Sequence, residues 1–126
     1  MALAAGLAEA RLVEITVLNT TDLHGAICRS PGTYAERNEG SLLQCATLVR
    51  REREQAPDLL LLDCGDVVQG TAASFQTRGG IMAVAMNAMG YDAYVPGNHE
   101  FDWGIDALAG LDRKSTRLNS SHLGIS

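Results

Sequence analysis

The sequence has few cysteines, no long hydrophobic run and no glycine-rich nucleotide-binding motif, and each absence excludes a class of protein. The three cysteines, Cys28, Cys45 and Cys64, are odd in number and lack Cys-x-x-Cys spacing, so neither a disulfide framework nor a structural zinc site is indicated. No apolar segment approaches the roughly 20 residues that a membrane-spanning helix needs. Because no Gly-x-Gly-x-x-Gly or P-loop motif follows a predicted strand, a dinucleotide-binding domain is disfavoured.

Basic residues are also scarce over most of the chain. The 126 residues include 15 acidic and 10 basic side chains, for a formal net charge of −5. Three of the basic residues, Arg113, Lys114 and Arg117, lie in a terminal segment without acids, so residues 1–112 carry 7 basic against 15 acidic groups, a net charge of −8. An acidic surface of this kind does not bind a nucleic-acid backbone by itself. If the protein binds a phosphate group, cations must mediate the contact.

The length and the 46% content of hydrophobic residues predict one globular domain with a modest core. Segments rich in β-branched residues or leucine predict strands, and segments with helical apolar spacing predict helices. The expected strands cover residues 13–20, 58–63 and 91–95, and the expected helices cover residues 41–56, residues 81–89 and a segment that begins at Ile105.

Four consecutive leucines at residues 59–62 indicate a middle strand that is buried on both faces, as in a parallel sheet with helices on each side. The helix before this strand is predicted to begin with a capping box of Ser41 and Gln44, and Pro57 is predicted to end it. The order strand, helix, strand is that of a βαβ unit. The predicted fold class is therefore α/β with mostly parallel strands.

Polar side chains follow each of the predicted strands. Asp22 and His24 come after the first strand, and their spacing places them on the same side of an extended segment. Asp66 follows the second strand, and Asn98 and His99 follow the third. Open α/β sheets bind their ligands at the carboxyl ends of the strands, so we expect one shared site there.

Residues 97–102, Gly-Asn-His-Glu-Phe-Asp, concentrate an amide, an imidazole and two carboxylates. Such a cluster is costly to bury and is typical of a metal or acid/base site, although a polar turn is the alternative for this stretch taken alone. Oxygen and imidazole ligands without cysteine suit Mn²⁺, Zn²⁺, Fe²⁺ or Mg²⁺. Asp66 is central among the strand ends and is the natural bridge between two ions held roughly 3.5 to 4 Å apart.

Three separated motifs carry a resemblance to a known family. They are Thr-Thr-Asp-Leu-His-Gly at residues 20–25, Gly-Asp-Val-Val-Gln-Gly-Thr at residues 65–71, and the stretch at residues 97–102. In this order they resemble the first three motifs of calcineurin-like metallophosphoesterases. Their fuller wording is similar to the 5′-nucleotidase family within that superfamily, and the resemblance covers residues 14–111.

The resemblance implies part of a four-layer αββα metallophosphoesterase sandwich that holds two divalent metal ions, such as Zn²⁺, Mn²⁺ or Mg²⁺. By the same resemblance, Asp22, His24 and Asp66 would bind the first ion, and Asp66 and Asn98 the second.

His99 would be the general acid or transition-state donor, with Asp102 as its dyad partner. A carboxylate beside an imidazole fixes the tautomer of the ring and favours its protonated form, so the pairing is physically reasonable.

The implied function is hydrolysis of nucleoside 5′-monophosphates or related phosphoesters. A 2′,3′-cyclic nucleotide or a nucleotide sugar is the alternative substrate within the family, and a non-catalytic nucleotide- or metal-binding α/β module is the alternative of a different class. The expected partner is a small-molecule nucleotide or phosphoester, with no nucleic acid and no membrane span, and the oligomeric state stays open.

The sequence also departs from the family pattern. The family carries two further histidine motifs and a C-terminal base-binding domain, whereas the histidines here are His24, His99 and His122. We divide the chain into an N-terminal extension or leader remnant (1–12), the N-terminal part of the catalytic domain (13–112) and a non-native-looking tail (113–126), and we do not expect His122 to bind metal. The family and the suspected leader indicate a periplasmic or extracellular protein, and the fragment alone is expected to be inactive.

Overall fold

The computed structural model describes residues 12–28 and 40–114. Strands β1 (Val17–Thr20), β2 (Leu60–Asp63) and β3 (Ala93–Tyr94) form one parallel sheet in the order β1-β2-β3. The expectation of a parallel α/β arrangement is therefore confirmed. The prediction of an extension or leader remnant at residues 1–12 lies, except for Leu12, outside the described residues, and the prediction about His122 also lies outside them.

Strand β1 begins at Val17, not at residue 13 as predicted. Val17 is the first residue with a partner in the ladder, Leu60, and the Leu60 N–H also donates to the carbonyl of Thr16 at 3.0 Å. Because β2 begins at Leu60, the apolar residues Val13 and Ile15 have no paired strand among the described residues. β propensity alone does not make a strand without such a partner.

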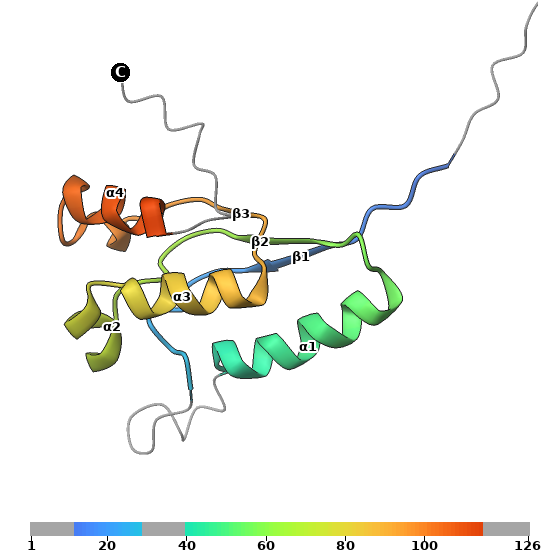
Figure 1. Ribbon diagram of the computed structural model, residues 1–126, viewed down its shortest axis with the longest axis horizontal. Helices are drawn as coiled ribbons and strands as arrows, with labels where there is room; N and C mark the ends of the chain where they lie inside the picture. The colour runs from blue at the N-terminus through green and yellow to red at the C-terminus, as the bar shows by residue number, and fades with distance from the viewer. Residues whose placement is uncertain (1–11, 29–39, 115–126) are drawn as a thin grey trace, which may run out of the picture.

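Helices α1 (Leu42–Gln55) and α3 (Gly80–Met89) lie side by side along the sheet (Figure 1). Both α2 (Ala72–Thr77) and α4 (Ile105–Lys114) contact α3, and the short 3₁₀ helix η2 (His99–Phe101) contacts α4. Helix α4 runs past the boundary expected at residue 112. None of the helices in the described ranges combines the length and the apolar composition needed to cross a membrane.

One hydrophobic core lies between the sheet and the helices. Leu61 of β2, Met82 of α3 and Tyr91, which precedes β3, have no exposed surface. The core cluster draws on α1, β2, the loop after β2, α3 and α4, and consists of Leu42, Val49, Leu59, Leu61, Val67, Val68, Met82, Ala83, Met86, Tyr91 and Leu111. This cluster holds β2 and its following loop in place, and the site described below is built on that loop.

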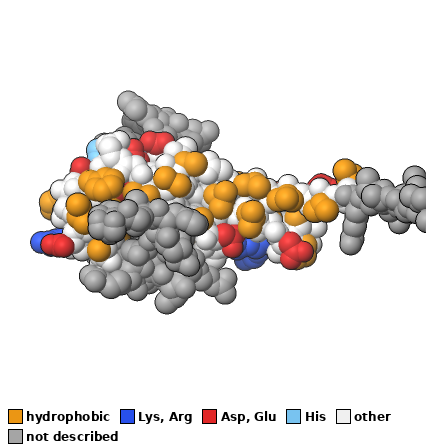
Figure 2. Space-filling view, turned by 90° about the horizontal axis from the view of Figure 1, so that it is seen from above, with side chains coloured by type: hydrophobic (Ala, Val, Ile, Leu, Met, Phe, Trp, Pro, Cys, Tyr) orange, Lys and Arg blue, Asp and Glu red, His pale blue; other side chains and the backbone are white. Residues whose placement is uncertain are grey.

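The prediction that the leucine strand is covered on both faces is wrong for the described residues. Leu61 and Asp63 point into the core, whereas Leu60 is 41% exposed on the opposite face. Val17, the ladder partner of Leu60, is also exposed, and Figure 2 shows hydrophobic side chains in a band along this side of the molecule. We call this surface, formed by Val13, Ile15, Val17, Leu60 and Val95, the outward sheet face.

The predicted capping box at the start of α1 is not formed. The Ser41 side chain makes no bond to the helix backbone and instead donates to Gln44 Oε1 at 3.3 Å. The first free N–H groups of the helix, those of Leu42 and Leu43, donate to the carbonyls of residues 26 and 27. A tertiary contact therefore takes the place of the cap, and the sequence carries no local sign of it.

Helix α2 was not predicted, because its six residues are too few to show a helical period. The sequence feature that marks the start of this helix is Thr71, whose side chain accepts the N–H of Ser74 at 3.3 Å and so caps the helix. The helix ends at Thr77, and the next residue, Arg78, has a left-handed backbone conformation.

Candidate metal centre

The loops that follow β1 and β2 run together beyond the ends of the strands. The backbone N–H of Asp22 donates to the carbonyl of Gly65 at 3.0 Å, and that of His24 donates to the carbonyl of Asp66 at 2.9 Å. These bonds extend the pairing of β1 with β2 into the loops. They bring two of the predicted metal ligands beside the third.

Asp22, His24 and Asp66 all have positive φ angles, of 55°, 45° and 57°. This left-handed backbone costs a residue other than glycine about 1 to 3 kcal/mol, and it is concentrated at functional sites. The prediction that Asp22 and His24 lie on the same side because the segment is extended is therefore wrong. A turn after β1, and not strand alternation, sets their relative position.

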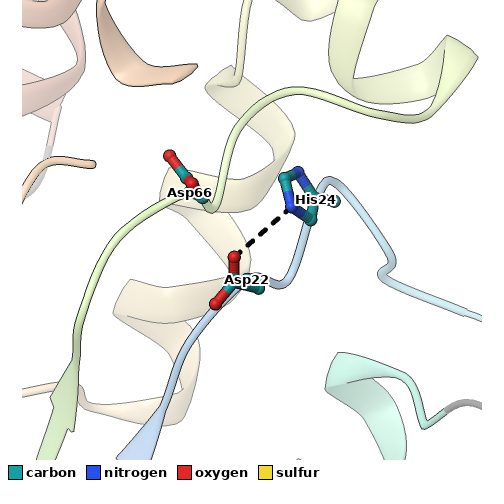
Figure 3. A group of neighbouring side chains, drawn as sticks. All are labelled: Asp22, His24 and Asp66. Atoms are coloured by element: carbon teal, nitrogen blue, oxygen red, sulfur yellow. Dashed lines mark ion pairs between the residues drawn. The ribbon is translucent and has the colours of Figure 1, made fainter. Parts of the chain in front are cut away.

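The three side chains converge on one point. One ligand atom of each of Asp22, His24 and Asp66 lies within 4.8 Å of the other two (Figure 3). His24 Nε2 is 3.6 Å from Asp22 Oδ1. His24 and Asp66 are half-buried and Asp22 is exposed, so an ion from solvent can reach the group.

Further hydrogen bonds orient the first two side chains. His24 Nδ1 lies 3.1 Å from the carbonyl of Gln69. Because a carbonyl only accepts, Nδ1 carries the proton, and Nε2 of the neutral ring keeps a lone pair for a metal. Asp22 Oδ2 accepts the hydroxyl of Thr21 at 2.5 Å, which leaves Oδ1 beside His24.

The loop after β3 reaches the same edge of the sheet. The backbone N–H of His99, at the start of η2, donates to Asp66 Oδ1 at 3.0 Å. Asn98 immediately precedes His99, and its side chain is exposed. The structure thus places Asn98 one residue before the N–H that binds Asp66, in the loop that reaches the same edge of the sheet.

His99 and Asp102 form a hydrogen-bonded pair. His99 Nδ1 lies 2.9 Å from Asp102 Oδ2, so Nδ1 donates and Nε2 stays free. The hydrogen bond to Asp102 raises the pKa of His99 above its usual value, and the charges of Asp102, Asp66 and Glu100 act in the same direction. The His99 ring stands edge-on to the His24 ring, with 5.3 Å between the ring centroids, so the pair lies beside the ligand cluster.

The donor set of the cluster fits a divalent cation. Two carboxylates and one imidazole nitrogen, without a thiolate, suit Mn²⁺, Zn²⁺, Fe²⁺ or Mg²⁺. Asp22 and Asp66 repel each other as neighbouring carboxylates, and a bound cation would remove that repulsion. Cys64 is exposed and donates to Asn19 Oδ1 at 3.2 Å, outside the cluster.

Two buried acids support the site, and the sequence analysis assigned a role to neither. Asp63, 1% exposed, accepts the hydroxyl of Thr20 at 2.5 Å and the N–H of Gly65 at 2.7 Å, which fixes the turn before Asp66. Burial raises the pKa of Asp63 above its usual value. Glu100 is also 1% exposed and accepts backbone N–H groups from two loops. The only sequence signal for either residue is a carboxylate within three positions of a predicted ligand.

Comparison with known proteins shows which family the chain belongs to. The sequence model of the family described as calcineurin-like phosphoesterase matches residues 15–123. The chain belongs to this family. Members of the family use divalent metals, and the donor set of the cluster here fits such an ion.

Relatives of this chain carry nucleotidase names. It is 41% identical over 104 residues to the 5′-nucleotidase of Bos taurus, an alignment that covers 79% of this chain and 18% of the relative. It is 39% identical over 100 residues to the 5′-nucleotidase of Homo sapiens, which covers 75% and 17%. The chain therefore spans less than a fifth of the length of these relatives.

A solved structure shares the fold. The crystal structure of the calcineurin-like phosphoesterase YfkN from Bacillus subtilis superimposes with a TM-score of 0.62 at 34% identity, over 79% of this chain and 34% of YfkN. The predicted family and the metallophosphoesterase fold class are thereby confirmed. The names of these relatives favour an enzyme over a non-catalytic binding module.

Proposed function

We propose that this chain is the N-terminal part of the catalytic domain of a metal-dependent hydrolase that acts on nucleoside 5′-monophosphates. The observation that carries the proposal is the meeting of Asp22, His24 and Asp66 within 4.8 Å, beside the hydrogen-bonded His99 and Asp102. The 5′-nucleotidase names of its relatives support the substrate class.

The site would hold two divalent ions. Asp22, His24 and Asp66 would bind one ion, and Asp66 together with Asn98 would bind the other. When bound, such ions polarise phosphoryl oxygens and lower the pKa of water. The carboxylates of this chain would neutralise part of the charge of the ions, and the amide of Asn98 would help to orient one of them. With the ions held in this way, an acidic protein would bind a phosphate.

His99 would hold the proton that the reaction needs. Its Nδ1 is bound to Asp102, so the proton available for transfer is on Nε2 of the protonated ring. The raised pKa of His99 keeps this proton on the ring to higher pH. Nε2 would donate it to the phosphoryl group or to the leaving oxygen, while Asp102 keeps the ring in position.

The substrate would be a small molecule outside the cytoplasm, in the periplasm or the extracellular space. A relative that is 39% identical over 99 residues is a snake venom 5′-nucleotidase from Gloydius brevicauda, which supports an exported protein.

The test uses a full-length protein that carries this chain, assayed for phosphate release from AMP with added Mn²⁺. We expect metal-dependent turnover that falls at least about 10³-fold in Asp66→Ala, because that change removes a ligand of both ions. Asp58→Ala is the matched control, since it removes an exposed carboxylate before β2, and it should keep the activity.

Residues 1–126 alone, assayed in the same way, should bind Mn²⁺ weakly and show no turnover, because among the described residues only Asp66 and Asn98 are proposed as ligands of the second ion. The proposal fails if the full-length protein saturates with Mn²⁺ but hydrolyses no phosphoester, or if Asp66→Ala retains full turnover.

A further inference from the structure

Glu100 joins the loop after β2 to the loop after β3. Its Oε2 accepts the backbone N–H of Asp66 at 2.9 Å and of Gly97 at 2.6 Å. Its Oε1 accepts the N–H of Val67 at 2.7 Å and of Val68 at 3.3 Å. A single buried carboxylate therefore accepts four backbone N–H groups, three from consecutive residues of the loop after β2 and one from the loop after β3.

These four bonds also exclude other roles for Glu100. A carboxylate has about four lone-pair positions, two on each oxygen, and each oxygen here already accepts two N–H groups. No lone pair is left for a metal ion or for a proton of a substrate. The side chain is 1% exposed, so it does not reach a substrate from solvent.

The contact between the loops is reciprocal. Glu100 accepts the N–H of Asp66, and Asp66 Oδ1 accepts the N–H of His99. The loops touch so closely that a Cβ at Gly97 would lie 2.3 Å from Asp66 Oδ1, so only glycine fits there. Asp66, which makes both of these hydrogen bonds, has a left-handed backbone conformation with a φ of 57°.

From these contacts we propose that Glu100 is a positioning residue for the metal centre, which fixes Asp66 against Asn98 and His99 in the arrangement that binds the ions. The inference rests on the proposed metal centre but concerns a residue to which that centre assigns no role. Replacing Glu100 would leave the Asp66 side chain in place as a ligand. The backbone around Asp66 would, however, lose the hydrogen bonds that hold it in a strained conformation.

The test compares three variants of the full-length protein. Glu100→Gln is nearly the same size, but its amide NH₂ meets two of the N–H donors, so it loses about half of the contact. Glu100→Asp keeps the charge and shortens the reach. Val49→Ala, a change in the core on α1, is the structural control, because it lowers stability from a position that lies outside both loops.

The first measurement is hydrogen exchange of the metal-free protein, read by mass spectrometry. We expect peptides that cover residues 64–69 and 95–101 to exchange at least about tenfold faster in both Glu100 variants and at the wild-type rate in Val49→Ala. The second is Mn²⁺ affinity, which we expect to fall about 10- to 100-fold in the Glu100 variants and to be kept in Val49→Ala.

Wild-type exchange and Mn²⁺ affinity in Glu100→Gln would overturn the inference. It is also overturned if Val49→Ala, at an equal loss of Tm, weakens Mn²⁺ binding as much as the Glu100 variants do. These results are independent of turnover: a wild-type protein that binds Mn²⁺ without hydrolysing AMP refutes the proposed function, and the exchange rates still decide the role of Glu100.

Discussion

The carboxyl edge of the sheet and the outward sheet face differ in how completely the described residues hydrogen-bond the polar groups of the one and cover the apolar groups of the other. At the edge, the buried acids Asp63 and Glu100 have hydrogen-bond partners, and no buried side-chain nitrogen or oxygen of the described residues lacks one. On the outward sheet face, Val17, Leu60 and Val95 are 50%, 41% and 62% exposed. Contacts among the described residues thus set the geometry of the site. The stability of the sheet, in contrast, depends on an apolar surface that the described residues do not cover.

This contrast separates two kinds of substitution. Changes at the carboxyl edge should alter metal binding or proton transfer with little effect on solubility. Changes on the outward sheet face should alter aggregation with little effect on the ligands.

Among substitutions at the carboxyl edge that leave the metal ligands unchanged, His99→Ala is expected to have the largest effect. In the full-length protein this change should lower kcat by about 10² to 10⁴, because it removes the proton donor. The metal content should stay at the wild-type level, since His99 is not a proposed ligand. Metal stoichiometry by atomic emission, measured beside the rate, is the check. A variant that also loses its metal would make His99 a ligand instead of a donor.

A smaller effect is expected for Asp102→Asn, which keeps the shape of the pair and removes its charge. We expect a loss of about 10- to 100-fold in kcat, the value of a charge-assisted hydrogen bond. The pKa of His99 is raised mainly by this hydrogen bond, so activity that needs the protonated ring is present at low pH and is lost as the pH rises through the raised pKa. The alkaline limb of the pH–rate profile should therefore move to lower pH in the variant. An unmoved limb would show that another group titrates there.

The smallest effect on the site is expected on the outward sheet face. In the 126-residue chain, Leu60→Lys should reduce aggregation, measured by light scattering, because a charge on an open apolar face opposes association. The stability should change by only about 0.5 kcal/mol, as for most exposed positions. Leu61→Lys, the neighbour that has no exposed surface, is the control and should unfold the chain. An equal loss of stability in the two variants would mean that the two faces of β2 are equally packed.

The parts of this structure that the sequence predicts are those set by local pattern and by the order of strands. Asp22, Asp66 and His99 each follow a predicted strand, and parallel strands bring their carboxyl ends to one edge. The spacing of His99 and Asp102 is three residues, which one turn of η2 converts into a direct hydrogen bond. These features need no information about distant contacts.

The parts that the sequence does not predict depend on contacts between distant segments. Glu100 accepts N–H groups from residues 66–68, more than 30 positions earlier, and no local pattern encodes that bond. Leu42 at the start of α1 is likewise satisfied by the carbonyl of Ala26. The leucine run gives the hydrophobicity of β2 but not the number of its faces that are covered, because helix packing decides that.

Asp22, His24 and Asp66 are proposed to form one metal site at the carboxyl edge of the sheet. The most direct measurement is a crystal structure of the full-length protein with Mn²⁺, with anomalous scattering recorded at the manganese edge. We expect an anomalous peak about 2.0 to 2.3 Å from His24 Nε2 and from one carboxylate oxygen of each aspartate. A peak bound to other residues, or no peak on these three side chains at saturating Mn²⁺, would contradict it.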